Sequence, residues 1–165
     1  MTVVSNSTPL IHLSAVSDLS LLRRLFALVT IPAAVRDEVV TSGAGRPGAR
    51  EIAEAIGSWI RVEPVRPSRN THLEMERQKL QLGEVQAIEL AQALPAEILL
   101  MDERRAVEFA RSLGLTVFRT GTVYVAAKRA GLIDSVRTKL DALRAGGFWL
   151  KDQDYAAIVR LCGEL

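Results

Sequence analysis

The chain of 165 residues has one cysteine, few aromatic residues and no long apolar run. The single Cys162 excludes an intramolecular disulfide and a cysteine-based zinc site. No apolar stretch approaches the roughly 20 residues that a membrane helix needs, so we expect no membrane contact. The first residues lack a basic region and a small-residue cleavage site, so we expect no secretory signal. These features together favour a cytoplasmic protein.

Several catalytic and binding motifs are also missing. Neither a GxGxxG nor a Walker A motif occurs, which argues against a nucleotide-binding doubly-wound domain. No Ser–His–Asp or Cys–His arrangement stands out, so nucleophilic catalysis is disfavoured. We interpret His12 as a residue packed at the edge of the core and His72 as a surface residue. Trp59 and Trp149 indicate core or interface rather than a base-stacking platform.

The charge of the chain permits contact with nucleic acid but does not require it. The formal net charge is +2 and the sequence pI is about 9.0, whereas dedicated non-specific binders are usually more basic. Arg104 and Arg105 fit either a solvated helix surface or contact with an RNA backbone. With 48% hydrophobic residues, the chain has enough apolar material for a proper core.

Apolar runs alternate with segments of helical period, which predicts an α/β fold with a parallel sheet. Neither a repeat nor a long linker divides the chain, so we expect a single domain over residues 1–165 with a C-terminal helical tail from about residue 148. A Gly-rich loop is expected at residues 41–49. The expected strands are residues 2–5, 29–31, 59–65 (ended by Pro64 and Pro67), 97–101 and 115–118. The expected helices are residues 8–15, 19–28 (capped by Asp18), 33–40, 50–57, 70–82 (broken by Gly83), 84–93, 103–113, 122–130, 135–143 and 152–162.

Polar and acidic residues follow the expected strands, where open parallel sheets bind their ligands. Packed carboxylates repel one another and take up protons unless a cation compensates them. Their hard oxygen atoms favour Mg²⁺ or Mn²⁺ over zinc, and such ions can activate a water against a phosphodiester. Acidic residues at helix starts also serve as caps and dipole partners, so both interpretations stay open. The residues concerned are Asn6, Ser7, Thr8, Glu38, Glu84, Asp102 and Glu103.

Five segments in this order resemble PIN-like domains: VVSNSTPLIHL, VTIPAAVRDEVV, LGEVQAIELA, ILLMDERRAVEFARSLGL and TGTVYVAAKRAGLI. They are similar in particular to a subfamily of prokaryotic proteins related to VapC-type toxins. The resemblance implies a three-layer α/β/α sandwich around a central parallel sheet. It also implies a Mg²⁺- or Mn²⁺-dependent endoribonuclease acting on RNA, commonly the toxin of a type II toxin–antitoxin pair, with a cognate antitoxin and a homodimeric state.

The resemblance assigns roles to individual residues. Asn6 falls where the family has its first aspartate, and an asparagine oxygen can ligate a hard cation but brings no charge. The alternative function is therefore a catalytically weak or inactive PIN-like module that binds RNA or a protein partner. A phosphotransfer domain would need an aspartate at this position and is disfavoured. The implied catalytic residues are Glu38, Glu84 and Asp102; the implied metal ligands are these three with Asn6 and the adjacent Glu103; the implied substrate-binding residues are Ser7 and Thr8.

Overall fold

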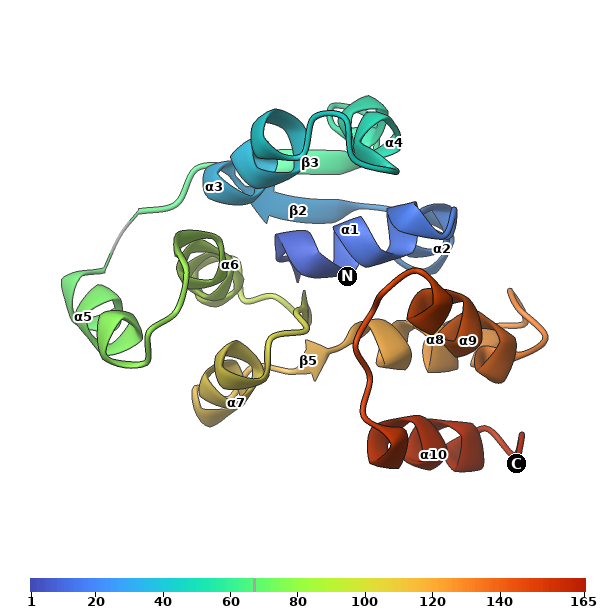
Figure 1. Cartoon of the computed structure of the whole chain (residues 1–165). Helices are drawn as coiled ribbons and strands as arrows, with labels where there is room; N and C mark the ends of the chain where they lie inside the picture. The colour runs from blue at the N-terminus through green and yellow to red at the C-terminus, as the bar shows by residue number, and fades with distance from the viewer. Residues whose placement is uncertain (67) are drawn as a thin grey trace.

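The computed structural model describes residues 1–66 and 68–165, and Figure 1 shows how its helices surround the strands. The strands form one five-stranded sheet. The strand order is β3-β2-β1-β4-β5, and every pairing is parallel. The parallel sheet predicted from the sequence is thus confirmed. Pro67, which was expected to help end the third strand, lies outside the described residues. The strands are β1 (Val3–Ser5), β2 (Val29–Pro32), β3 (Ile60–Glu63), β4 (Ile98–Leu100) and β5 (Val117–Phe118).

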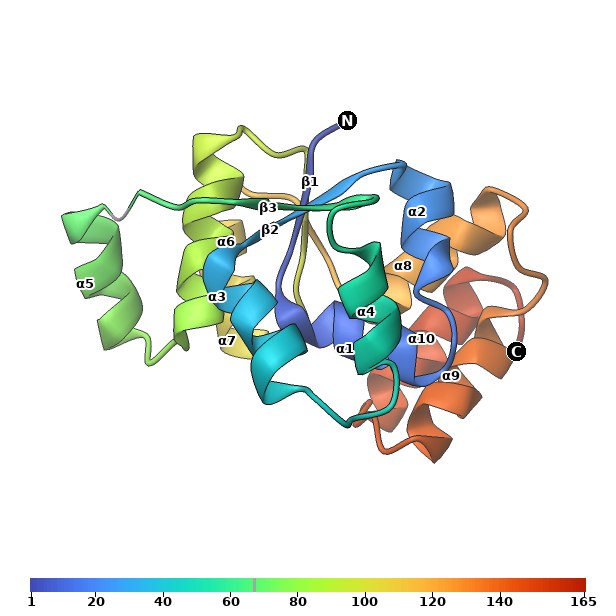
Figure 2. The ribbon, with the colours of Figure 1, turned by 90° about the horizontal axis from the view of Figure 1, so that it is seen from above.

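Helices cover both faces of the sheet, which confirms the three-layer α/β/α architecture. Figure 2 shows α6 and α7 on one side of β1, and α2 and α8 on the other. No described helix is both long and apolar enough to span a membrane. The helices are α1 (Ser7–Ala15), α2 (Ser20–Phe26), α3 (Ala33–Arg36), the π-helix η1 (Asp37–Ser42), α4 (Ala49–Ala55), α5 (Arg69–Arg77), α6 (Leu82–Ala93), α7 (Arg104–Ser112), α8 (Thr120–Arg129), α9 (Val136–Ala145) and α10 (Asp152–Leu161).

The central strands bury both of their faces, which produces two hydrophobic cores. Val3 packs in the core that contains α1, α2, α8 and α9, while Val4 packs in the core that contains α6 and α7. Leu100 and Leu99 divide in the same way on β4. Successive strand residues point to opposite faces, so a strand covered on both sides is apolar throughout. This is why the buried runs of the sequence identified the strands.

Asp18 does not cap α2, contrary to the expectation from the sequence. Leu19 occupies the N-cap position of α2. The Asp18 carboxylate instead accepts hydrogen bonds from the Tyr124 hydroxyl at 2.7 Å and from Lys139 Nζ at 2.8 Å. A buried carboxylate needs such partners. Burial, together with Asp18, raises the pKa of Tyr124 above its usual range. Asp18 therefore joins the start of α2 to α8 and α9.

Two helix boundaries near the carboxyl edge of the sheet also differ from the expected ones. The helix that starts at Ala33 changes into the π-helix η1 and continues to Ser42, so the Gly-rich loop begins later than expected. Gly83 does not break a helix but lies inside α6, and the break falls at residues 78–81. Both differences matter for the site, because η1 carries Glu38 and the start of α6 carries Glu84.

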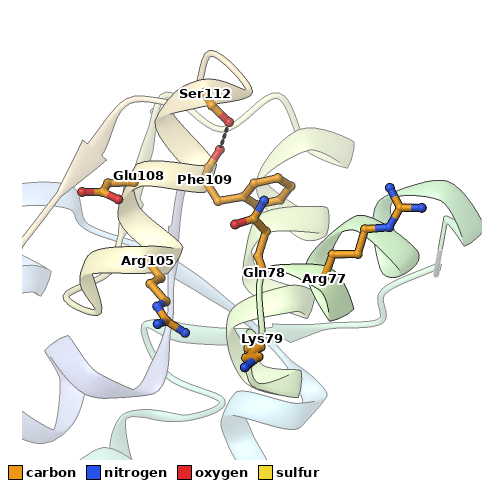
Figure 3. Close-up of a pocket in the computed structure, with 7 residues that line it drawn as sticks. All are labelled: Arg77, Gln78, Lys79, Arg105, Glu108, Phe109 and Ser112. Carbon is orange, nitrogen blue, oxygen red and sulfur yellow. Dashed lines mark hydrogen bonds between the residues drawn. The ribbon is translucent and has the colours of Figure 1, made fainter.

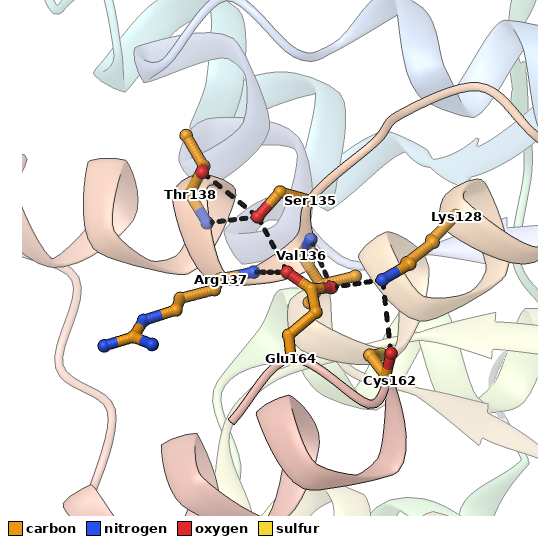
Figure 4. Close-up of polar contacts among 7 residues, drawn as sticks. All are labelled: Lys128, Ser135, Val136, Arg137, Thr138, Cys162 and Glu164. Atoms are coloured by element: carbon orange, nitrogen blue, oxygen red, sulfur yellow. Dashed lines mark hydrogen bonds and ion pairs between the residues drawn. The ribbon is translucent and has the colours of Figure 1, made fainter.

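Glu164 fastens the C-terminal end of the chain to α8 and α9 (Figure 4). Its carboxylate accepts hydrogen bonds from Lys128 Nζ at 2.8 Å and from Ser135 Oγ at 2.7 Å. The backbone N–H groups of Val136 and Arg137 donate to it at 2.9 and 3.1 Å. These contacts, with that of Lys128 the largest, lower the pKa of Glu164 to about 2. The carboxylate thus neutralises Lys128 and satisfies the free donors at the start of α9.

Replacing Glu164 with glutamine is expected to lower the free energy of unfolding at pH 7 by about 1.5–3 kcal/mol, the usual worth of hydrogen bonds to a charged group. The folded pKa lies below the ordinary value of 4.5, so this stabilisation is complete above that value. It is lost as the pH falls toward about 2. Urea unfolding of both proteins across this pH range measures the difference. The exposed Glu97, changed to glutamine, is the control; equal stability of Glu164→Gln and the unchanged protein at pH 7 would contradict the prediction.

Candidate functional site

The candidate site lies at the carboxyl ends of β1 and β4, which are neighbours in the sheet. From β1 the chain continues to β2 and β3 on one side, whereas β4 and β5 lie on the other. Ligands of open α/β sheets bind at such a switch point. Asn6 directly follows β1, and its N–H donates to the carbonyl of Leu100 at 2.9 Å. The sheet therefore fixes the backbone of Asn6 beside the end of β4, two residues before Asp102.

A cavity of about 370 Å³ opens at this edge, and we call it the acidic cavity. Four segments contribute to it: the start of α1, η1, the turn that leads into α6, and the start of α7. Two cationic side chains stand at its border. The lining residues are Asn6, Ser7, Thr8, Glu38, Lys79, Leu80, Gln81, Glu84, Glu103 and Arg105.

The side chain of Asn6 has an unusual environment. Asn6 occupies the N-cap position of α1, but its side chain makes no capping hydrogen bond, so the interpretation of this side chain as a cap is wrong. The residue is 2% exposed, and its Oδ1 has no hydrogen-bond partner among the described residues. An unpaired buried acceptor costs roughly 1–3 kcal/mol. Such an oxygen beside a polar cavity indicates a ligand that it would bind.

Glu38 and Asn6 approach each other across Gly83. The Ser7 hydroxyl donates to Glu38 Oε2 at 2.5 Å and so fixes this carboxylate. A Cβ atom on Gly83 would collide with Glu38 Oε1 and would stand 3.4 Å from Asn6 Oδ1. Gly83 has an ordinary helical backbone, so the glycine is needed for space rather than for its backbone angles. It leaves room for two oxygen atoms of the acidic cavity.

Glu84 combines a capping role with a place in the acidic cavity. Its Oε1 accepts a hydrogen bond from the N–H of Gln81 at 2.9 Å at the start of α6. Burial raises the pKa of Glu84, the bond from Gln81 lowers it, and the charges of Glu103 and Glu38 raise it further. The Glu84 carboxylate is therefore close enough to Glu103 and to Glu38 to be repelled by both. A cation among them would relieve this repulsion.

Asp102 faces an adjoining hollow of about 340 Å³ rather than the acidic cavity. Its Oδ1 accepts from the N–H of Thr120 at 2.8 Å, and its Oδ2 accepts from the Thr120 hydroxyl at 2.6 Å. His12 Nδ1 lies 3.3 Å from Oδ2. Thr8 and Glu103 line both hollows. Over residues 1–66 and 68–165, no three His, Cys, Asp or Glu side chains are close enough to hold one metal ion.

Sequence reasoning missed the partners of Asp102 and the space around Gly83. Thr120 lies shortly after β5, and nothing in the sequence around it indicates that it binds Asp102. His12 was expected at the edge of the core, and its ring packs against that of Phe148 with 4.3 Å between the ring centroids. Its contact with Asp102 has no local signal in the sequence. The role of Gly83 depends on the approach of η1, so the sequence around Gly83 could not reveal it.

The oxygen atoms of the acidic cavity suit a hard divalent cation. Asn6 Oδ1 offers a buried neutral oxygen without another partner in the described part of the chain. Glu38, Glu84 and Glu103 add carboxylate oxygens around the same space. Mg²⁺ and Mn²⁺ prefer this ligand set, and none of the described residues that line the cavity brings a sulfur or imidazole group. The cavity therefore fits such an ion by its chemistry, although its side chains do not form a closed ligand cluster.

Comparison with protein-family models places the chain in a known family. The model of the family DUF3368, a PIN domain, matches residues 2–164. No curated protein matches the chain. The matched range contains all five strands, the acidic cavity and the hollow beside Asp102.

Proposed function

The chain belongs to the PIN domain family, whose fold is a nuclease fold, and on this basis we propose that it is a metal-dependent endoribonuclease that cleaves RNA phosphodiesters. One observation carries the proposal. The buried Oδ1 of Asn6, without a partner in the described chain, lies beside Glu38 at the carboxyl edge of the sheet. A structural asparagine would be paired or exposed, whereas a metal-binding one is left free for its ion.

Asn6, Glu38 and Glu84 would hold a Mg²⁺ or Mn²⁺ ion. Glu103 lines both hollows and would stand beside this ion, whereas Asp102 would act from the second hollow. The bound ion would supply a Lewis acid and an activated water at the phosphodiester. The Ser7 hydroxyl keeps the Glu38 carboxylate oriented through their hydrogen bond. The backbone N–H groups at the start of α1, beside Ser7 and Thr8, suit a phosphate oxygen, because helix N-termini favour anions.

The wider biological role is part of the same proposal. The resemblance to VapC-type toxins supports a toxin of a type II pair, with a cognate antitoxin and a second copy of the chain as partners. A cytoplasmic location agrees with the RNA substrate and with a single cysteine, which needs no oxidising compartment.

The test is cleavage of a panel of single-stranded and structured RNAs with Mg²⁺, Mn²⁺ or EDTA. We expect cleavage with either metal, none in EDTA, and recovery when excess metal is added back. Removal of the metal should abolish the activity, because the carboxylates alone provide neither a Lewis acid nor an activated water. Cleavage that persists in EDTA, or no cleavage with any metal, would contradict the proposal.

The second candidate function is a weak or inactive PIN module that binds RNA or a protein partner. The uncharged Asn6 favours it, because one negative charge is missing from the cavity. Asn6→Asp should tighten Mn²⁺ binding about tenfold, or about 1.4 kcal/mol, when measured by isothermal titration. If Asn6→Asp cleaves RNA and the unchanged protein does not, the inactive module is the right assignment. Unchanged Mn²⁺ affinity would remove Asn6 from the ligand set.

A further inference from the structure

A second groove of about 590 Å³ lies beside the acidic cavity, between the end of α5 and α7 (Figure 3). Three cationic side chains line it, and we call it the basic groove: Arg77, Lys79 and Arg105. Lys79 and Arg105 also line the acidic cavity. The two spaces therefore share a border, and these two cations stand along it.

The positive charge of the basic groove is poorly compensated. Glu108 is the one acidic residue that the described part of the chain places in this groove, so a single carboxylate, itself in an exposed pair with Arg104 at 3.0 Å, stands against three cations. Arg77 makes only an exposed pair with Glu74 at 3.5 Å, and such pairs contribute little. Lys79 and Arg105 form no ion pair with any described residue. Two cations at the mouth of an acidic cavity thus remain available to a ligand.

Lys79 has a left-handed backbone conformation, which favours glycine. It follows α5 with a φ of +57°. The N–H of Leu80 bonds to the carbonyl of Met75 at 3.2 Å, and that of Lys79 bonds to the carbonyl of Glu76 at 3.0 Å. This is a Schellman motif, whose left-handed residue is usually glycine. A side chain in this conformation costs roughly 1–2 kcal/mol, and such strain concentrates at functional sites.

We infer that the basic groove binds the backbone of single-stranded RNA next to the phosphodiester held in the acidic cavity. This inference rests on the proposed function and adds to it the path of the substrate. Lys79 supplies a point charge and Arg105 a planar fork for phosphate oxygens. Phosphates of a bound RNA would contact these two cations next to the carboxylates of the acidic cavity. The positive charge would reduce the repulsion between the phosphates and the carboxylates. A single strand fits a groove between two helices, whereas side chains cannot enter the deep groove of an RNA duplex.

The experiment measures binding without cleavage. A fluorescent single-stranded RNA is titrated in EDTA against the unchanged protein, Lys79→Gly, Arg105→Gln and the control Arg50→Gln, whose side chain on α4 is 92% exposed. Lys79→Gly and Arg105→Gln should each weaken binding about tenfold at low salt. Each should also reduce the slope of log affinity against log salt by about 0.7, the contribution of one phosphate contact on a single strand. Arg50→Gln should leave both quantities unchanged.

Lys79→Gly also separates binding from folding. Glycine relieves the left-handed strain, so its melting temperature should equal or exceed that of the unchanged protein while RNA binding falls. Unchanged affinity and salt slope in both groove variants would overturn the inference. Equal binding of polyglutamate, with the same dependence on Lys79, would assign the groove to an acidic protein partner instead of RNA. If cleavage depends on metal but neither variant alters its KM, the RNA-binding role of the basic groove is rejected and the nuclease function stands. If RNA binding depends on the groove but no cleavage occurs, only the nuclease function is rejected.

Discussion

Replacing Glu38 with glutamine is expected to reduce metal-dependent RNA cleavage by at least about a hundredfold, with the fold intact. Glutamine has the size of glutamate, and its amide oxygen can still accept the hydrogen bond of the Ser7 hydroxyl. The change removes the negative charge of Glu38, and the neighbouring Asn6 Oδ1 is neutral and does not replace it. Changing a group that merely supports a metal ligand costs 10- to 100-fold, so removing the charge of a ligand should cost at least as much.

The neighbouring Asp37 offers a matched control for this change. It belongs to the same π-helix, its side chain is 61% exposed, and it pairs with Arg36 at 3.0 Å. Asp37→Asn therefore removes the same charge one residue away from the cavity. Initial cleavage rates at saturating Mn²⁺ and melting temperatures should show a large loss for Glu38→Gln alone. If Glu38→Gln retains cleavage within twofold of the unchanged protein, Glu38 is not a ligand of the catalytic ion.

The sheet could be predicted from the sequence because its signal is local. Continuous apolar runs such as residues 97–101 mark strands that are buried on both faces, and Ile98, Leu99 and Leu100 do divide between the two cores. The residues that follow such strands must then reach one edge of the sheet. This reasoning brings Asn6 and Asp102 near each other without any knowledge of their side-chain directions.

The finer arrangement of the site depends on contacts between distant segments. Asp102 turns toward Thr120 and His12, which are 18 and 90 residues away in the chain, and this draws its carboxylate out of the acidic cavity. The π-helix that carries Glu38 has no clear local signal in the sequence. The left-handed conformation of Lys79 has none either, because the residue is not a glycine. Strand ends therefore predicted which residues gather, but not which of them share one cavity.

Replacing Gly83 with alanine is expected to lower cleavage about a hundredfold without destabilising the fold. Gly83 is the second residue of α6, and alanine is a better helix former than glycine, so the change should not weaken the helix. The Cβ of alanine, however, would occupy the place of Glu38 Oε1 and come within 3.0 Å of Glu38 Cδ. The Glu38 side chain is flexible and must move, which takes its carboxylate away from Ser7 and Asn6. The expected result is thus a protein of equal or higher melting temperature that has lost the geometry of its metal site.

Gly146 is the matched control, because its backbone has a negative φ of −82° and the nearest atom to an added Cβ is 3.5 Å away. Gly146→Ala should therefore leave cleavage unchanged. The double variant Gly83→Ala/Glu38→Gln then tests the mechanism of the loss. Since Gly83 acts through the Glu38 carboxylate, the double variant should be no less active than Glu38→Gln alone, a strong departure from additivity. Additive losses would mean that Gly83 affects the cavity by another route, and full activity of Gly83→Ala would mean that the position of Glu38 beside Asn6 is not required for cleavage.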